Sequence, residues 1–168
     1  MSTTQSTPSS AEIIATSGTE QFLTFKIGES EYGVDIMSVR EVKGWVATTR
    51  LPNRPDYVRG VLNLRGIIVP IFDLRARFGQ GLTEATEKHV MIIIALGDRI
   101  AGALVDAVSD ILTVTSEAVK PPPSGDLEIS DQFVRGLIAV EERMVILLDM
   151  EKLLRADMDE ALTNETLN

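Results

Sequence analysis

Short apolar runs separated by turn residues recur along the chain, and several of them lie in segments that repeat each other. Residues 57–79 contain an aromatic residue, Val-Arg-Gly, an apolar run, a turn, a second apolar run, and an Asp that opens a short helical pattern. The same order appears in residues 133–155, which lie 76 positions further along. At a shift of 69 positions, residues 28–42 match residues 97–111. The chain therefore contains an internal duplication.

Each half is predicted to consist of about five short strands with turns between them and little helix. Asp73 is a typical helix N-cap and Gly79 a typical helix end, which predicts a short helix between them. Apolar residues spaced by three in segment 36–45 fit either a helical turn or an irregular strand. The other predicted elements are a hairpin at 22–34, a loop at 48–56, a polar linker at 80–88, strands at 89–96 and 100–105, and an amphipathic helix at 149–162.

These elements predict a mainly β fold made of two small five-stranded barrels and a C-terminal helix. A five-stranded sheet of this size hides its edges best by closing into a barrel, and two barrels can share apolar surface. The domain is expected at 20–155, with halves at about 21–79 and 89–155 and with strands that can be exchanged between the barrels. Residues 1–19 are polar and predict a disordered tail, and residues 156–168 predict an acidic C-terminal tail.

Composition narrows the class of protein. The chain has 168 residues, 44% hydrophobic and 24% charged, as in a soluble globular domain. It lacks cysteine, a secretory signal and any apolar run near the roughly 20 residues that insert into a bilayer, so we expect a cytoplasmic protein. A net charge of -9 opposes nucleic-acid binding. The charged residues are mostly basic in segment 40–77 and mostly acidic in segment 84–131. This pattern indicates either docking faces for different proteins or solvated loops.

The chemistry that most enzymes need is missing from the sequence. Catalysis usually requires a nucleophile beside a base, paired carboxylates in a cleft, or a metal cluster. His89 is the only histidine and stands at the start of a predicted strand, which favours a structural or exposed role. The sequence has no phosphate-binding glycine loop and no dinucleotide fingerprint. We therefore expect no enzymatic activity, no metal and no other cofactor.

The two halves differ at one turn. The first half has Asn-Leu-Arg-Gly at 63–66 where the second has Ala-Val-Glu-Glu at 139–142, so a hairpin here does not require Asn or Gly. In one interpretation Asn63 and Gly66 supply positive φ angles and Arg65 is solvated. In the other, Arg65 is a forked donor for an acidic or amide group of a partner. The residue types alone favour neither interpretation.

Four motifs around this turn form a specific combination. They are Asn-Leu-Arg-Gly at 63–66, Ile-Val-Pro-Ile-x-Asp-Leu-Arg at 68–75, Tyr-Gly-Val-Asp-Ile-x-x-Val-Arg-Glu-Val at 32–42, and Val-Arg-Gly in both halves. Together they resemble the CheW family, the coupling proteins of bacterial chemotaxis, over about 21–155. The resemblance implies two SH3-like five-stranded barrels without enzymatic activity. It also implies a stand-alone adaptor, since the chain has no room for a kinase core or a receiver domain.

The resemblance further implies two docking surfaces. One binds the membrane-distal tip of a chemoreceptor cytoplasmic hairpin, and the other binds the regulatory domain of the histidine kinase CheA, which has the same fold. Kinase contacts are expected at apolar loop or barrel-end residues in each half, without individual assignment. The protein would be recruited to membrane-associated receptor arrays. By position, the receptor surface is expected to include Val39, Glu41 and Arg65, with Asn63, Leu64 and Gly66 shaping the turn.

An exposed ion pair at Arg65 is too weak to carry such binding. It supplies about 0 to 1 kcal/mol, whereas micromolar affinity corresponds to roughly -8 kcal/mol. Apolar anchors must carry most of the binding free energy. Val39 fits either this groove or the core, Val42 is predicted to be core, and Trp45 is predicted to plug the core rather than to contact a partner.

Two other functions fit parts of the sequence. A CheW-like adaptor can serve another kinase pathway, such as surface motility, with a sensor outside the membrane. A small barrel of the OB type can bind single-stranded nucleic acid, but the acidic charge and the few aromatic residues oppose this.

Overall fold

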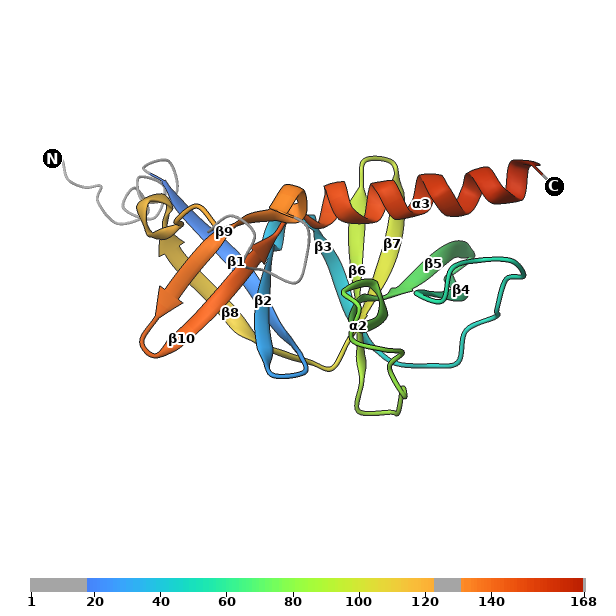
Figure 1. Cartoon of the computed structure of the whole chain (residues 1–168), viewed down its shortest axis with the longest axis horizontal. Helices are drawn as coiled ribbons and strands as arrows, with labels where there is room; N and C mark the ends of the chain where they lie inside the picture. The colour runs from blue at the N-terminus through green and yellow to red at the C-terminus, as the bar shows by residue number, and fades with distance from the viewer. Residues whose placement is uncertain (1–17, 123–130, 168) are drawn as a thin grey trace, which may run out of the picture.

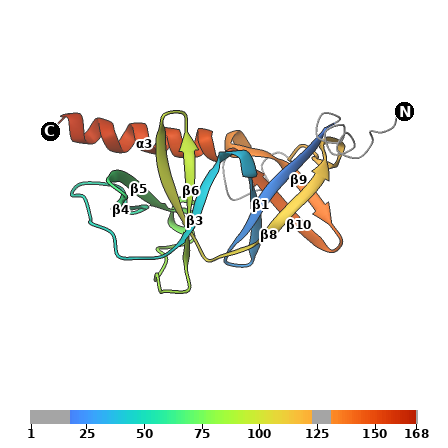
Figure 2. The same cartoon turned by 180° about the vertical axis from the view of Figure 1, so that it is seen from behind.

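The computed structural model describes residues 18–122 and 131–167, which form two five-stranded sheets and a long C-terminal helix (Figure 1). The sheets lie side by side along the long axis of the molecule, and the helix runs from their junction across one of them (Figures 1 and 2). This architecture confirms the predicted mainly β fold with a C-terminal helix. The expected tail at 1–19 lies outside the described residues except for its last two positions, and β1 begins at Thr19.

Each sheet combines strands from both halves of the duplication. The first sheet, barrel A, has the strand order β8 (Ala107–Thr115), β1 (Thr19–Ile27), β2 (Ser30–Asp35), β10 (Arg143–Leu148) and β9 (Val134–Val140). The second sheet, barrel B, has the order β3 (Val39–Gly44), β6 (Val90–Leu96), β7 (Arg99–Val105), β5 (Ile67–Asp73) and β4 (Val58–Leu64). Barrel A thus takes one hairpin from the first half and three strands from the second, and barrel B does the reverse. One central pair in each barrel is parallel, β2 with β10 and β5 with β7.

A backbone bridge closes each sheet into a barrel. In barrel B the chain after β3 bridges β4 at Thr49, and in barrel A the chain after β8 bridges β9 at Lys120. The glycine of each Val-Arg-Gly motif lies beneath this crossing. A Cβ atom on Gly60 would lie 2.2 Å from the Thr49 carbonyl oxygen, and one on Gly136 would lie 2.8 Å from that of Lys120. Closure of the barrel therefore explains the glycine in both copies of the motif.

The segment at 36–45 contains both structures that its spacing allowed. A 3-10 turn, η1 (Ile36–Ser38), is capped by the side chain of Asp35, and β3 follows directly. The predicted short helix is confirmed as α2 (Leu74–Arg77), which begins after its cap Asp73 and ends before Gly79, where φ is 80°. Two further 3-10 turns, η2 (Ser116–Ala118) and η3 (Asp131–Phe133), lie between β8 and β9.

Three apolar clusters form the core. One fills barrel A around Phe22, and one fills barrel B around Ile71. The third and largest cluster lies between the barrels, where β1 contributes Phe25 and β6 contributes Ile94, and where α2 and the C-terminal helix add further side chains. Because each barrel buries side chains both inside itself and against its neighbour, the barrels pack as one unit.

The C-terminal helix α3 (Met150–Leu167) is longer than the sequence indicated. The predicted helix ended at Leu162 and the predicted domain at residue 155, yet Asp157 and Met158 are both buried. The acidic residues indicated a solvated tail, but an ion pair between Asp157 and Arg77 lets the packed helix continue. No helix in the described part of the chain is long and apolar enough to cross a membrane.

Candidate docking surfaces

The β4–β5 hairpin carries the turn that distinguishes the two halves. Arg65 and Gly66 form a two-residue turn with φ angles of 53° and 90°, respectively. Asn63 lies in β4, and its side-chain oxygen accepts a hydrogen bond from the backbone N–H of Gly66 at 2.8 Å. In the interpretation that Asn63 and Gly66 supply the positive φ angles, the part about Gly66 holds, but Arg65 takes the place of Asn63. Leu64 is buried in barrel B and anchors the turn from inside.

Arg65 forms an ion pair with Glu41 of β3. Its Nη2 atom lies 2.6 Å from a Glu41 carboxylate oxygen, and the Arg65 side chain remains 73% exposed. Val39 lies apart from this pair. It is paired with Ile94 on the face that packs against the central core, whereas Glu41 is paired with Ile93, which belongs to the barrel B interior. The structure thus brings together two of the three expected groove residues.

Two expectations about the end of β3 have opposite outcomes. Val42 is 45% exposed, so the prediction that it is a core residue is wrong. Trp45 is half-buried and packs against the cluster inside barrel B, which confirms its core role. The guanidinium of Arg59 lies 5.2 Å from the centre of the Trp45 ring and donates a hydrogen bond to the buried Asp73 at 3.0 Å. β3 therefore presents Val42 as its exposed apolar side chain.

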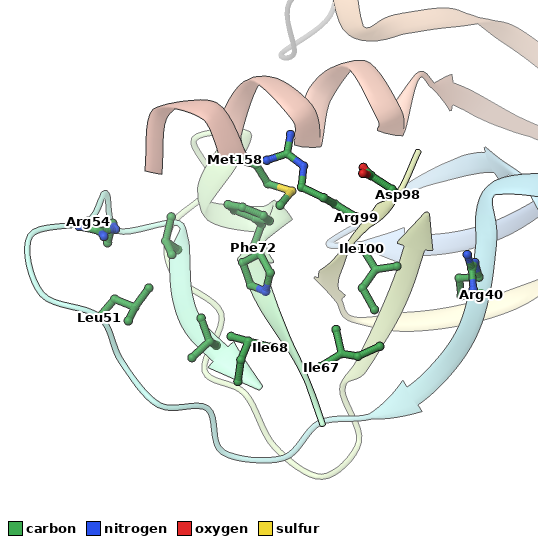
Figure 3. A pocket seen from close by; sticks show the side chains of 13 residues that line it. Arg40, Leu51, Arg54, Ile67, Ile68, Phe72, Asp98, Arg99, Ile100 and Met158 are labelled. Atoms are coloured by element: carbon green, nitrogen blue, oxygen red, sulfur yellow. The ribbon is translucent and has the colours of Figure 1, made fainter. Parts of the chain in front are cut away.

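An apolar pocket of about 540 Å³ lies on the outer side of the β4–β5 hairpin (Figure 3). In Figure 3, Met158 reaches from α3 toward Phe72, while Arg54 and Arg40 lie at opposite ends of the pocket. No motif in the sequence indicated this pocket. The apolar wall is formed by residues of β4, β5, β7 and α3: Val61, Ile67, Ile68, Phe72, Ile100 and Met158.

Ile67 and Ile68 give the pocket an open side. They are 55% and 62% exposed, although both are large apolar residues in a strand. The available signal was their position directly after the turn. Because successive strand residues point to opposite faces, two adjacent isoleucines cannot both enter one barrel.

Barrel A has charged residues at two of the equivalent positions. The repeat alignment places Arg143 where barrel B has Ile67, and Glu31 where barrel B has Ile100. Arg143 donates hydrogen bonds to Glu31 at 2.7 and 3.0 Å and lies 3.6 Å from Asp110. The hydrogen bond with Glu31 raises the pKa of the Arg143 guanidinium above its usual value, so this group stays charged. An ion-pair network thus occupies the place that is apolar in barrel B.

His89 belongs to a structural network at the junction of the barrels. Its Nδ1 atom accepts a hydrogen bond from the backbone N–H of Thr86 at 3.0 Å, and its Nε2 atom lies 3.7 Å from Asp106. Asp106 lies between β7 and β8, and it also accepts hydrogen bonds from Gly28 and Arg75. Within the described residues, no three His, Asp or Glu side chains are grouped as metal ligands.

Comparisons with known proteins identify the family. The family model of the CheW-like domain matches residues 21–158. A probable chemotaxis protein CheW of Rhizobium etli is 44% identical over 144 residues, which cover 86% of this chain and 93% of that protein. Chemotaxis protein CheW of Klebsiella aerogenes is 44% identical over 138 residues, which cover 82% of this chain and 83% of that protein.

A solved structure supports the same relationship. The crystal structure of the scaffolding protein TtCheW from Thermoanaerobacter tengcongensis is similar to this chain with a TM-score of 0.71 and 33% sequence identity. The similarity covers 77% of this chain and 83% of that one. With a family model over most of its length and two relatives above 40% identity, the chain belongs to the CheW family of chemotaxis scaffold proteins.

Proposed function

We propose that this protein couples chemoreceptors to the histidine kinase CheA through two docking surfaces and without catalysis. The observation that carries the proposal is the β4–β5 hairpin, which has a charged tip at Arg65 and an apolar outer face at Ile67 and Ile68. Two chemically different surfaces on one hairpin suit two protein partners. Family membership supports the scaffold role, and binding to receptors recruits the protein from the cytoplasm to membrane-associated arrays.

The charged tip is the proposed surface for the chemoreceptor hairpin. Arg65 binds Glu41 through Nη2, so its other N–H groups remain available to a receptor carboxylate or amide. An exposed pair adds only about 0 to 1 kcal/mol, so apolar contacts must supply most of the affinity. Val42 is the exposed apolar residue of β3 that fits this need. Of the residues expected from the resemblance, the proposed surface keeps Glu41 and Arg65, with Asn63, Leu64 and Gly66 shaping the turn, and it omits Val39, which faces the central core.

The apolar pocket is the proposed surface for the CheA regulatory domain. Exposed apolar patches of this kind mark protein interfaces. Complete burial of an exposed isoleucine contributes about 1.5 to 3 kcal/mol, and Ile67 and Ile68, at 55% and 62% exposed, each have roughly half of that left to contribute. An apolar side chain of the partner barrel fills the pocket. Arg40 and Arg54, at the ends of the pocket, pair with acidic groups of the partner beside that apolar side chain.

Calorimetric titration with each partner separates the two surfaces. We expect Arg65→Glu to raise the Kd for a chemoreceptor cytoplasmic hairpin at least tenfold, about 1.4 kcal/mol, because it removes the guanidinium donor and places a second carboxylate beside Glu41, which repels an acidic group of the receptor. The Kd for the CheA regulatory domain should change less than twofold. Glu141→Arg is the matched control, since Glu141 has a similar φ of 55° in the equivalent turn of barrel A. It should leave receptor binding unchanged.

The outcomes of this titration are distinct. Loss of receptor binding alone supports two separate surfaces with Arg65 in the receptor site. Equal loss of both partners means that the tip is not specific for the receptor. If the wild-type protein binds neither partner, the proposed coupling function is wrong.

A further inference from the structure

α3 is held against the barrels by an arginine that lies between two aromatic rings. The Nε atom of Arg77 in α2 lies 2.9 and 3.1 Å from the two carboxylate oxygens of Asp157 in α3. The Arg77 guanidinium lies 5.4 Å from the ring centres of both Tyr57 and Phe133. These rings are equivalent residues of the two halves, and they precede β4 of barrel B and β9 of barrel A. The contact therefore fixes α3 relative to both barrels.

The burial of this ion pair indicates that it sets a position more than it adds stability. The Asp157 side chain is only 2% exposed, and that of Arg77 is 25% exposed. Removing a carboxylate from water costs several kcal/mol, which the attraction to its partner roughly offsets. The pair is directional, however, because the single Nε–H of Arg77 is shared between both carboxylate oxygens and so keeps the Asp157 carboxylate in front of Nε. It therefore selects one rotation of α3 about its axis.

That rotation places Met158 in the wall of the apolar pocket. Met158 follows Asp157 directly, is 4% exposed, and lines the pocket together with Val58 and Phe72. We propose that Arg77 and Asp157 are positioning residues that hold α3 so that Met158 completes the pocket for the CheA regulatory domain. The inference rests on the proposed function of that pocket. In it, kinase docking depends partly on a buried ion pair that acts through Met158 and does not itself contact the kinase.

The first test is Asp157→Asn, which keeps the size of the side chain and removes its charge. We expect the Kd for the CheA regulatory domain to rise about tenfold, while the Kd for the receptor hairpin changes less than twofold. Glu151→Gln is the matched control on the same helix. It makes the same chemical change and breaks the exposed ion pair of Glu151 with Arg155, which lies outside the pocket lining. It should change neither Kd.

A double-mutant cycle distinguishes positioning from general stability. If Asp157 acts through Met158, then Met158→Ala weakens kinase binding, and adding Asp157→Asn to it weakens binding little further. Hydrogen exchange should rise in the α3 amides of Asp157→Asn and stay unchanged in β6. Arg77→Lys is a second route to the same result if Asp157→Asn folds poorly. It keeps the positive charge but loses the planar group between the rings, so a smaller loss of kinase affinity is expected.

The results that overturn the inference are specific. Additive losses in the double variant, or normal kinase affinity with faster exchange in α3, mean that the ion pair only stabilises the helix. If the wild-type protein does not bind the regulatory domain at all, the kinase assignment of the pocket is wrong and the inference is wrong with it. The wild-type titration therefore separates the failure of the proposed function from the failure of the positioning role.

Discussion

The two barrels have the same framework but different surfaces. Gly33 and Gly102 are equivalent, and each lies beside a parallel strand, where a Cβ atom would approach Leu147 to 2.9 Å or Ile71 to 2.5 Å. At the surface the equivalence ends, because barrel A has Arg143 where barrel B has Ile67. Positions where a Cβ atom would clash with the neighbouring strand have glycine in both halves, whereas the surface positions 67 and 143 differ in charge. The differences between the halves are therefore a better guide to the proposed docking surface than their similarities.

The largest loss of stability is expected at Gly60 and Gly136, the equivalent glycines that lie beneath the bridges closing the two barrels. Both glycines have a backbone carbonyl oxygen in the way of a Cβ atom, at 2.2 Å for Gly60 and 2.8 Å for Gly136, but of the two only Gly60 has a positive φ, 127°. Gly60→Ala should lower the free energy of unfolding by about 3 to 5 kcal/mol, because conformational strain adds to the clash. Gly136→Ala should cost about 1 to 3 kcal/mol. Urea denaturation measures both values.

Gly44→Ala provides the control for these glycines. Gly44 is the last residue of β3 in barrel B, and a Cβ atom there meets nothing within 4 Å. Its substitution should change the free energy of unfolding by less than about 1 kcal/mol. If Gly136→Ala costs as much as Gly60→Ala, the two closures are equally strained and the comparison of φ angles is misleading.

The order of strands, turns and helix caps was predictable because the same pattern appears in both halves of the duplication. Both copies of Val-Arg-Gly are visible in the sequence, and the Asp after the second strand of each hairpin caps a helix as predicted. The short helix after Asp73 was predictable for the same reason. Local capping rules decide such features, and distant contacts change them little.

The side of β3 on which each side chain lies was not predictable. Val39 and Glu41 are two residues apart, so a regular strand would place them on one face. A bulge between them shifts the register and turns Val39 toward the central core. The same irregular strand leaves Val42 exposed. The bulge depends on how β3 pairs with β6 of the other half, and that pairing is not encoded locally.

The second prediction compares equivalent exposed residues of the two barrels. Ile68 and Met144 are 62% and 56% exposed, and the repeat alignment places them at the same position. Ile68→Glu should raise the Kd for the CheA regulatory domain at least tenfold, because it puts a charge into the apolar pocket. Met144→Glu should change this Kd less than threefold. Both variants should keep their free energy of unfolding within about 1 kcal/mol of the wild type, because the side chains are exposed.

Calorimetry and thermal unfolding of the same samples check this prediction. Equal losses of kinase affinity in the two variants would show that both barrels dock the kinase by the same surface. That result would remove the distinction between the barrels. An unchanged Kd in Ile68→Glu would exclude the pocket as the kinase surface.

The smallest effect is expected when the surface of barrel A is converted toward that of barrel B. Arg143→Ile alone leaves Glu31, which is 10% exposed, without its main partner, and should cost about 1 to 2 kcal/mol of unfolding free energy. The double variant Glu31→Ile with Arg143→Ile removes both charges and should lie within about 1 kcal/mol of the wild type. Urea denaturation distinguishes them. A double variant less stable than Arg143→Ile would show that the ion pair supports the barrel itself. If the double variant instead recovers the free energy of unfolding of the wild type, the ion pair can be replaced by apolar residues at little cost. The fold then does not depend on the ion pair, which determines only the chemistry of the barrel A surface.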